Sequence, residues 1–137
     1  MFRWLDRVQP LGLLALRVVL GVIMVAHGYP KVFGGLSKHA AMVHSLGVPG
    51  WLGYVSAFAE FGGGLLLILG LFTRFAAFAV CINMLVAVFK VHLKNGLTGQ
   101  GGYEFSLSLA TVAFALIFFG AGPIAADWLF GTGGRGK

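Results

Sequence analysis

The chain has 137 residues, enough for one domain, and 58% of them are hydrophobic, with a mean hydropathy of +0.91. Only 10% are charged, too few to cover the surface of a soluble protein, so the composition indicates an integral membrane protein. The net charge of +6 comes mainly from lysines and arginines at the ends of apolar runs, where they anchor helices, so nucleic acid is not an expected partner.

The first half of the chain predicts one membrane helix and one surface loop. Residues 11–29 form an apolar run long enough to cross a bilayer, and it contains Arg17 and His27. Residues 30–50 predict an outer loop. Apolar residues recur within this loop at helical spacing, which favours a short helix lying in the membrane interface.

The second half predicts three further membrane helices, at residues 51–72, 74–93 and 103–120, joined by short connections. The sequence therefore predicts an all-α fold in which four antiparallel membrane helices form an up-down bundle. Four crossings put both termini on one side of the membrane. Basic residues number five on that side and four on the other, which favours cytoplasmic termini; the first set is Arg3, Arg7, Arg74, Arg135 and Lys137, and the second is Lys31, Lys38, Lys90 and Lys94.

One carboxylate interrupts the second predicted membrane helix near its middle. An ionised side chain at the centre of a membrane helix costs roughly 2.5 to 3.5 kcal/mol, so Glu60 should face protein and have a partner. Small residues that let another helix approach closely share its face; they are Gly53, Ser56, Ala57, Gly63 and Gly64. Glu60 is therefore expected to point into the bundle.

Depth along the predicted helices groups the polar residues. At about 1.5 Å per residue from the cytoplasmic end, Arg17 lies near 9 Å, Asn83 near 14 Å and Glu60 near 18 Å. Two interpretations remain open for this inner set. Arg17, Asn83 and Glu60 form a buried ion pair and amide that fix the packing of the helices, or Glu60 exchanges protons or binds a ligand with Arg17 as the opposing cation.

A second group of polar residues lies at about 24 to 27 Å, just under the outer headgroups, and consists of His27, Lys90, His92 and Glu104. In one interpretation, Lys31 and its neighbouring lysines reach to the membrane edge and the histidines are hydrated. In another, His27, His92 and Glu104 form a pocket for a polar headgroup such as a quinone ring. Axial ligation of a haem by the two histidines, and a metal site completed by Glu104, are weaker alternatives, and the sequence assigns no metal site.

Spaced motifs along the chain resemble those of the DoxX family of small bacterial membrane proteins, over residues 11–128. These are Arg17-x-x-x-Gly21, His27-Gly28-x-x-Lys31, Gly47-x-Pro49, Glu60-x-Gly62-Gly63, Gly70-x-x-Thr73-Arg74, Gly101-Gly102-x-Glu104, and Gly122 followed by Asp127. The resemblance implies a four-helix inner-membrane protein with a redox association. Some relatives are subunits of thiosulfate:quinone oxidoreductase, and others are linked to oxidative-stress complexes or to resistance against quinones and catechols.

The family pattern marks Arg17, His27, Lys31, Glu60 and Glu104, which overlap the residues selected by depth. Cys81 is the single cysteine and lies in an apolar run, so thiosulfate oxidation by this chain alone is not expected. The leading hypothesis is a subunit of an oxidoreductase, rather than a complete enzyme, that binds a quinone or similar amphipathic molecule.

Two other hypotheses remain: a non-catalytic membrane subunit or assembly factor, and a small proton-linked transporter that would need an oligomer. The expected partners are the lipid bilayer, a membrane or periplasmic redox partner, and further copies of the chain.

Overall fold

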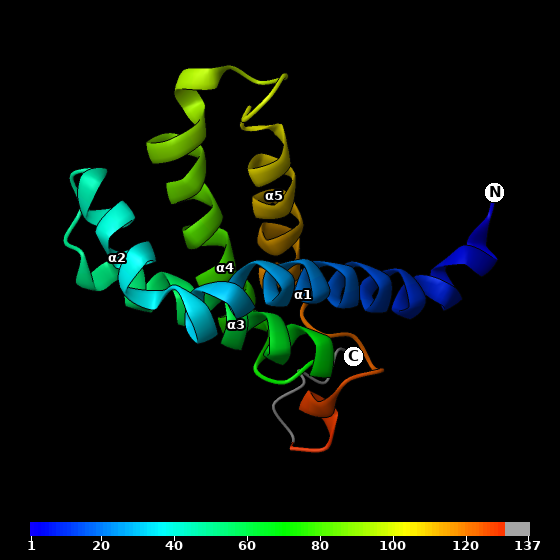
Figure 1. Ribbon diagram of the computed structural model, residues 1–137. Helices are drawn as coiled ribbons and strands as arrows, with labels where there is room; N and C mark the ends of the chain where they lie inside the picture. The colour runs from blue at the N-terminus through cyan, green and yellow to red at the C-terminus, as the bar shows by residue number, and fades with distance from the viewer. Residues whose placement is uncertain (131–137) are drawn as a thin grey trace.

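The computed structural model describes residues 1–130, and every regular element in that range is a helix, as the sequence predicts (Figure 1). Its α-helices are α1 (Gln9–Gly34), α2 (Leu36–Ser45), α3 (Trp51–Leu69), α4 (Thr73–Ala87) and α5 (Glu104–Phe119). The shorter elements are 3-10 helix η1 (Arg3–Val8), π-helix η2 (Val88–His92), and 3-10 helices η3 (Leu93–Asn95) and η4 (Ala126–Trp128). Arg135 and Lys137, which entered the prediction for the termini, lie outside the described residues.

Within residues 1–130, three helical stretches are long and apolar enough to cross a membrane: Arg3–Gly34, Trp51–Leu69 and Thr73–Asn95. The remaining apolar helix, α5, has 16 residues, so it is about 24 Å long, against a hydrocarbon core of about 30 Å. Many large apolar side chains are exposed over these helices, including Phe75, Phe78 and Phe119. Such an exposed apolar surface is suited to contact with lipid.

The helices are arranged as two antiparallel pairs that cross steeply (Figure 1). α1 and α3 lie side by side, α4 and α5 form the second pair, and α2 packs on the beginning of α3. The core between the pairs contains Leu20, Met24, Leu67, Val80 and Leu116. This arrangement differs from the up-down bundle of four membrane helices that the sequence predicted, because the two pairs cross steeply. The fifth α-helix of residues 1–130, α2, lies in the loop where the sequence predicted a short helix.

Glycines bring the backbones of α1 and α3 into contact. A Cβ atom added to Gly21 would lie 2.7 Å from the carbonyl oxygen of Gly64, and one added to Gly28 would lie 2.5 Å from the amide nitrogen of Phe61. Small residues permit this close approach between membrane helices. Their positions set an antiparallel register in which Gly28 of α1 faces residue 61 of α3.

The turn between α3 and α4 explains why the second helix pair leaves the first at an angle. Gly70 ends α3 with a φ of +68°, and Phe72 has a φ of +47°, so the chain reverses within a few residues. The carboxylate of Asp127 accepts hydrogen bonds from the amides of Phe72 (2.7 Å) and Thr73 (3.1 Å). It thereby satisfies two amides at the positive end of the α4 dipole.

We expect Gly64→Ala to destabilise the protein by about 1–3 kcal/mol, because its new methyl group would lie 2.8 Å from backbone atoms of α1. Gly62→Ala, two residues earlier on α3, is the matched control. No atom lies within 4 Å of its added Cβ, so it should be neutral or more stable by about 0.5–1 kcal/mol. Unfolding of both purified variants in detergent measures the difference, and equal stabilities would contradict the glycine contact.

Candidate functional site

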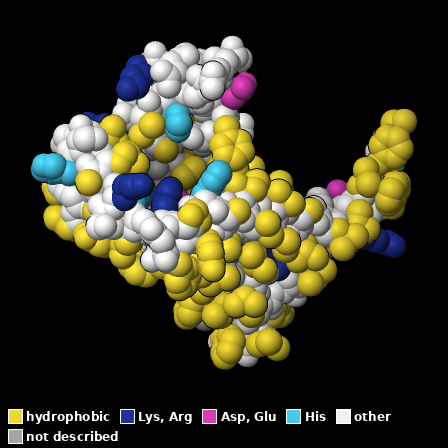
Figure 2. All heavy atoms as spheres, in the orientation of Figure 1, with side chains coloured by type: hydrophobic (Ala, Val, Ile, Leu, Met, Phe, Trp, Pro, Cys, Tyr) yellow, Lys and Arg dark blue, Asp and Glu magenta, His cyan; other side chains and the backbone are white. Residues whose placement is uncertain are grey.

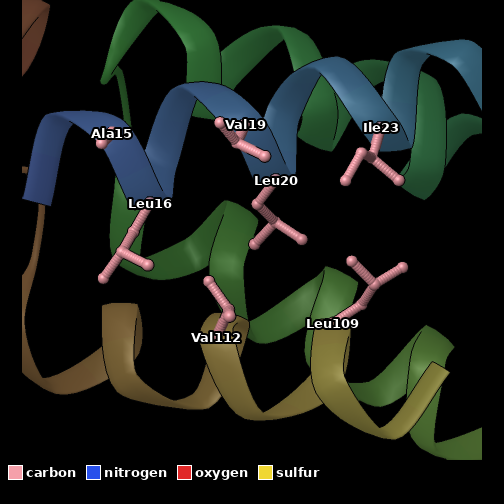
Figure 3. A pocket seen from close by; sticks show the side chains of 7 residues that line it. All are labelled: Ala15, Leu16, Val19, Leu20, Ile23, Leu109 and Val112. Atoms are coloured by element: carbon pink, nitrogen blue, oxygen red, sulfur yellow. The ribbon is translucent and has the colours of Figure 1, made fainter. Parts of the chain in front are cut away.

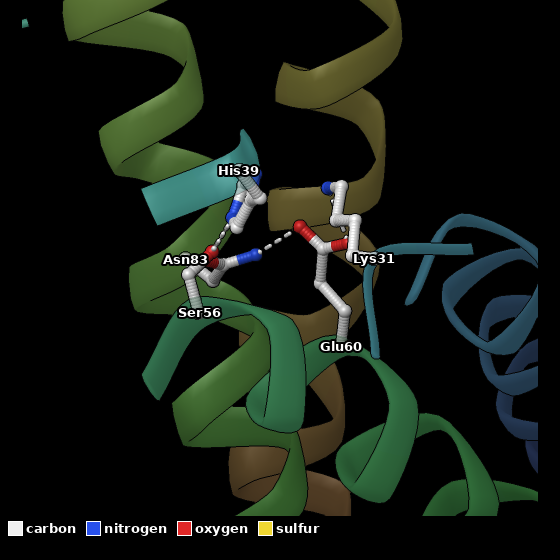
Figure 4. A network of polar contacts seen from close by, with 5 residues as sticks. All are labelled: Lys31, His39, Ser56, Glu60 and Asn83. Atoms are coloured by element: carbon white, nitrogen blue, oxygen red, sulfur yellow. Dashed lines mark hydrogen bonds and ion pairs between the residues drawn. The ribbon is translucent and has the colours of Figure 1, made fainter. Parts of the chain in front are cut away.

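The carboxylate of Glu60 lies at the centre of a hydrogen-bonded network between the helices (Figure 4). Glu60 is only 4% exposed, which confirms that it points inward. Its Oε2 accepts a hydrogen bond from Lys31 Nζ at 2.6 Å, and its Oε1 accepts one from Asn83 Nδ2 at 2.8 Å. Both oxygens act as acceptors, and one of them accepts from an ammonium group, which is the arrangement of an ionised carboxylate paired with a cation.

Two more side chains extend the network away from Glu60. Ser56 Oγ donates to Asn83 Oδ1 at 2.6 Å, and His39 Nε2 lies 3.4 Å from Ser56 Oγ. Since the single hydroxyl proton of Ser56 is used toward Asn83, Ser56 can only accept from His39, which requires a proton on His39 Nε2. Every donor in this hydrogen-bonded network is then oriented toward Glu60, and together the donors stabilise its negative charge.

The network connects four helices. Ser56 and Glu60 lie one turn apart on α3, while Lys31 comes from the end of α1, His39 from α2 and Asn83 from α4. The contact between α2 and α3 is close, because a Cβ atom on Gly53 would lie 2.6 Å from the Cα atom of Ala40, the residue after His39. His39 is therefore held against α3 and is buried.

The cation opposite Glu60 is Lys31, so the prediction that Arg17 has this role is wrong. Arg17 is 2% exposed, and its guanidinium donates to the backbone carbonyl oxygens of Ala121 (2.6 Å) and Ile124 (2.8 Å). It binds the chain after α5 to α1, near the end of α3, where a Cβ on Gly70 would lie 2.8 Å from its Nη1. In the register of α1 and α3, Arg17 faces Gly70, whereas Lys31 lies beside Glu60.

The three residues predicted to form an outer pocket have separate environments. The exposed His27 ring packs edge-on against Phe105 of α5, with ring centroids 5.8 Å apart. His92 Nδ1 lies 3.0 Å from the carbonyl oxygen of Gly101, and Glu104 is exposed at the start of α5. Within residues 1–130, no hydrogen bond or ion pair joins these three, and no group of three or more His, Cys, Asp or Glu side chains could hold a metal ion.

Basic and histidine side chains nevertheless gather in one region of the surface. In Figure 2 they lie over the end of α1, over α2 and over the upper part of the α4–α5 pair, whereas the surface over the beginning of α1 is mostly hydrophobic. Lys31 is 30% exposed, so the network that contains Glu60 reaches the surface through Lys31. His27 lies one helical turn before Lys31 on α1.

Sequence reasoning missed His39 and Ser56 as members of the site. His39 falls in the predicted outer loop of residues 30–50 and was given no role there, and Ser56 was expected only as a small residue on the Glu60 face. One signal was available: on the amphipathic helix α2, His39 precedes Ala40, and both lie on the buried face.

The fold and the network define a membrane protein whose central helices are joined through a buried, ionised carboxylate. The chain belongs to the DoxX family, whose model matches residues 12–93. This family assignment confirms the resemblance seen in the sequence. No solved structure matches the chain.

Three bacterial proteins are similar to the chain over most of its length. "Putative oxidoreductase CatD" of Bacillus subtilis is 33% identical over 106 residues, which cover 77% of this chain and 78% of that protein. An uncharacterized protein of Haemophilus influenzae is 32% identical, covering 90% of this chain and 93% of the relative. "Inner membrane protein YqjF" of Escherichia coli is 26% identical, with 87% and 90% covered.

Removing the ammonium group of Lys31 should destabilise the protein, because Glu60 would keep a buried charge without its cation. We expect Lys31→Met to lower the free energy of unfolding on the order of 2 kcal/mol, less than the roughly 3–5 kcal/mol of a fully buried pair, since Lys31 still contacts water. The double variant Lys31→Met/Glu60→Gln should recover part of the loss. Denaturant unfolding of the wild type, both single variants and the double variant measures the coupling energy between Lys31 and Glu60. Strictly additive effects of the two substitutions would exclude this coupling.

Stability should fall at acidic pH because of His39. Burial lowers the pKa of His39 from its ordinary value of 6.5 and the charge of Lys31 lowers it further, while Glu60 acts in the opposite direction. The folded state thus favours the neutral ring of His39. The neutral ring contributes its full stability above the pKa that His39 has in the unfolded chain, and this contribution is lost as the pH falls below about 6.5.

We therefore expect the unfolding temperature to fall between about pH 7 and pH 5, and to fall less in His39→Gln. His44→Gln, at an exposed position of the same helix, is the control and should retain the wild-type pH profile. Identical profiles for wild type and His39→Gln would show that His39 is not responsible.

Proposed function

We propose that this protein is a redox-associated subunit of the bacterial inner membrane that binds a quinone, or a similar small amphipathic molecule, beside Lys31 and Glu60. The observation that carries the proposal is the Lys31–Glu60 ion pair, in which a buried carboxylate is connected to the surface through a partly exposed ammonium group. Buried ionisable groups within membrane helices are expensive and commonly belong to functional sites.

The side chains around this ion pair are suited to an uncharged ring that carries oxygen atoms. Lys31 and His27 lie one turn apart on α1, so each could donate a hydrogen bond to a ring oxygen. The ring of Phe105 packs edge-on against His27, with centroids 5.8 Å apart, and supplies an apolar wall beside it. Small-molecule sites typically combine such apolar walls with a few polar groups.

In this proposal Glu60 exchanges a proton with the bound molecule. A proton added to Glu60 would remove the negative charge that attracts the ammonium group of Lys31. Lys31 would then be free to donate to the ligand, and Asn83 would keep Glu60 oriented. We assign His92 and Glu104 to the outer rim.

Electron transfer would take place between the bound molecule and a partner subunit, since Cys81 is the single thiol of the chain. The redox association draws support from the relative named "Putative oxidoreductase CatD", and the inner-membrane location from the relative named "Inner membrane protein YqjF". We further propose four membrane crossings with cytoplasmic termini, in which the short helix α5 provides the fourth.

A binding measurement tests the proposal. A short-chain ubiquinone should bind the purified protein in lipid nanodiscs, and Lys31→Met should weaken binding at least about tenfold, the usual scale for loss of a charge-assisted hydrogen bond. Glu60→Gln, a neutral mimic of the protonated carboxyl group, should retain binding, because Lys31 is then free to donate to the ligand. Asp6→Asn, at an exposed carboxylate near the N-terminus, is the control and should bind as the wild type does. Absence of binding to the folded wild type would refute the proposal.

If Lys31→Met folds and binds the quinone normally, the ion pair serves only to hold the helices together. Unfolding of the same preparations separates a loss of binding from a loss of fold.

A further inference from the structure

A groove without polar lining runs between α1 and α5, at some distance from the ion pair (Figure 3). Its volume is about 230 Å³. The side chains around it come from both helices and include Leu16, Val19, Leu20 and Ile23 of α1 and Leu109 and Val112 of α5. A dry apolar cavity of about 150 Å³ is large enough to bind benzene, so this groove can hold a hydrocarbon segment.

Contacts at both ends hold α1 and α5 together across the groove. At one end, Arg17 of α1 binds the carbonyl oxygens of Ala121 and Ile124, just after α5. At the other end, the ring of His27 packs against Phe105. The groove extends along α1 from Ala15 to Ile23, over about 12 Å.

The groove and the proposed quinone ring site lie along the same side of α1, with the His27–Phe105 contact between them. Ile23 of the groove lies one turn before His27 on α1, and His27 lies one turn before Lys31. On α5, Leu109 of the groove lies one turn after Phe105. The groove, the His27–Phe105 contact and Lys31 therefore follow one another along the same side of α1.

We infer that this groove holds the prenyl tail of the quinone whose ring binds beside Lys31, an inference that rests on the proposed function. The groove lies between membrane helices and offers no hydrogen-bonding side chain, so its occupant must be hydrocarbon rather than water. Its alignment with His27 and Lys31 along α1 favours a hydrocarbon chain attached to a polar head. The two sites together are suited to one ligand with a ring and a tail.

The tail should change affinity modestly. Moving a tail from lipid into the groove removes no apolar surface from water, so the gain comes from packing alone, as it does between membrane helices. We expect a prenyl tail to increase affinity about threefold to tenfold relative to the same ring without a tail.

A bulky side chain placed in the groove tests this inference. Val19→Trp should fill the groove, and Val22→Trp is its control, because Val22 is on the same helix, is similarly exposed (52%, against 57% for Val19) and lies outside the groove. Binding of a ubiquinone with two prenyl units and of the tailless ring is compared in nanodiscs. Partition into lipid is the same for every variant and cancels in the comparison.

The expected result is that Val19→Trp weakens binding of the prenylated quinone about threefold to tenfold and leaves binding of the tailless ring unchanged, while Val22→Trp alters neither. If Val19→Trp and Val22→Trp both bind the prenylated quinone as the wild type does, a tail in the groove is excluded, although the ring site stands. If a fluorescent phospholipid competes for the groove as well as the prenylated quinone does, the groove is a lipid site and the inference fails. If neither quinone binds the wild type, the proposed function and this inference fail together.

Discussion

The need of one buried carboxylate for hydrogen-bond donors governs the centre of this protein. Glu60 lies in the apolar helix α3, and without donors its charge would be among the most expensive groups in the fold. Lys31 and Asn83 supply those donors from α1 and α4, and Ser56 and His39 orient Asn83 from behind. Three of the four donors are on helices other than α3, so the charge can be satisfied only when these helices are packed. The same interactions therefore stabilise the fold and form the candidate site.

Close contact between α1 and α3 makes this arrangement geometrically possible. Gly21, Gly28 and Gly64 allow the backbones to touch, and their contacts fix the register between the two helices. That register places Lys31 beside Glu60 and carries Arg17 to the opposite end of the hairpin. Arg17 there binds the chain after α5, while Asp127 caps the beginning of α4. One end of the helix hairpin is thus specialised for holding the fold together, and the other for the polar network.

The proposed ligand unites features that lie on opposite sides of the His27–Phe105 contact. The ion pair, reached through Lys31, offers charge and hydrogen bonds, and the groove between α1 and α5 offers only apolar walls. A quinone with a prenyl tail has the same division between its ring and its chain. The polar network extends from Lys31 near the end of α1 to Glu60 in the middle of α3, which suits binding and local proton exchange better than conduction of protons across the membrane.

Sequence alone determined the helical class, the membrane character and the inward orientation of Glu60. These follow from composition and from periodicity within one helix, which are local properties. It also led to the DoxX family through the spacing of its motifs. The partner of Glu60 was assigned incorrectly, because depth measured along four upright, antiparallel helices matched Arg17 to the carboxylate. Glycine contacts between α1 and α3 set a different register, and the flexible side chain of Lys31 reaches inward from the helix end.

Only the tertiary structure decided which residues meet between helices. His39 joined the network because α2 packs on α3, His27 met Phe105 rather than His92, and the helix pairs crossed steeply because Phe72 and Gly70 turn the chain sharply. Contacts of this kind depend on register and crossing angle, which are set by packing between segments distant in the sequence. Periodicity within a single helix carries no information about either quantity.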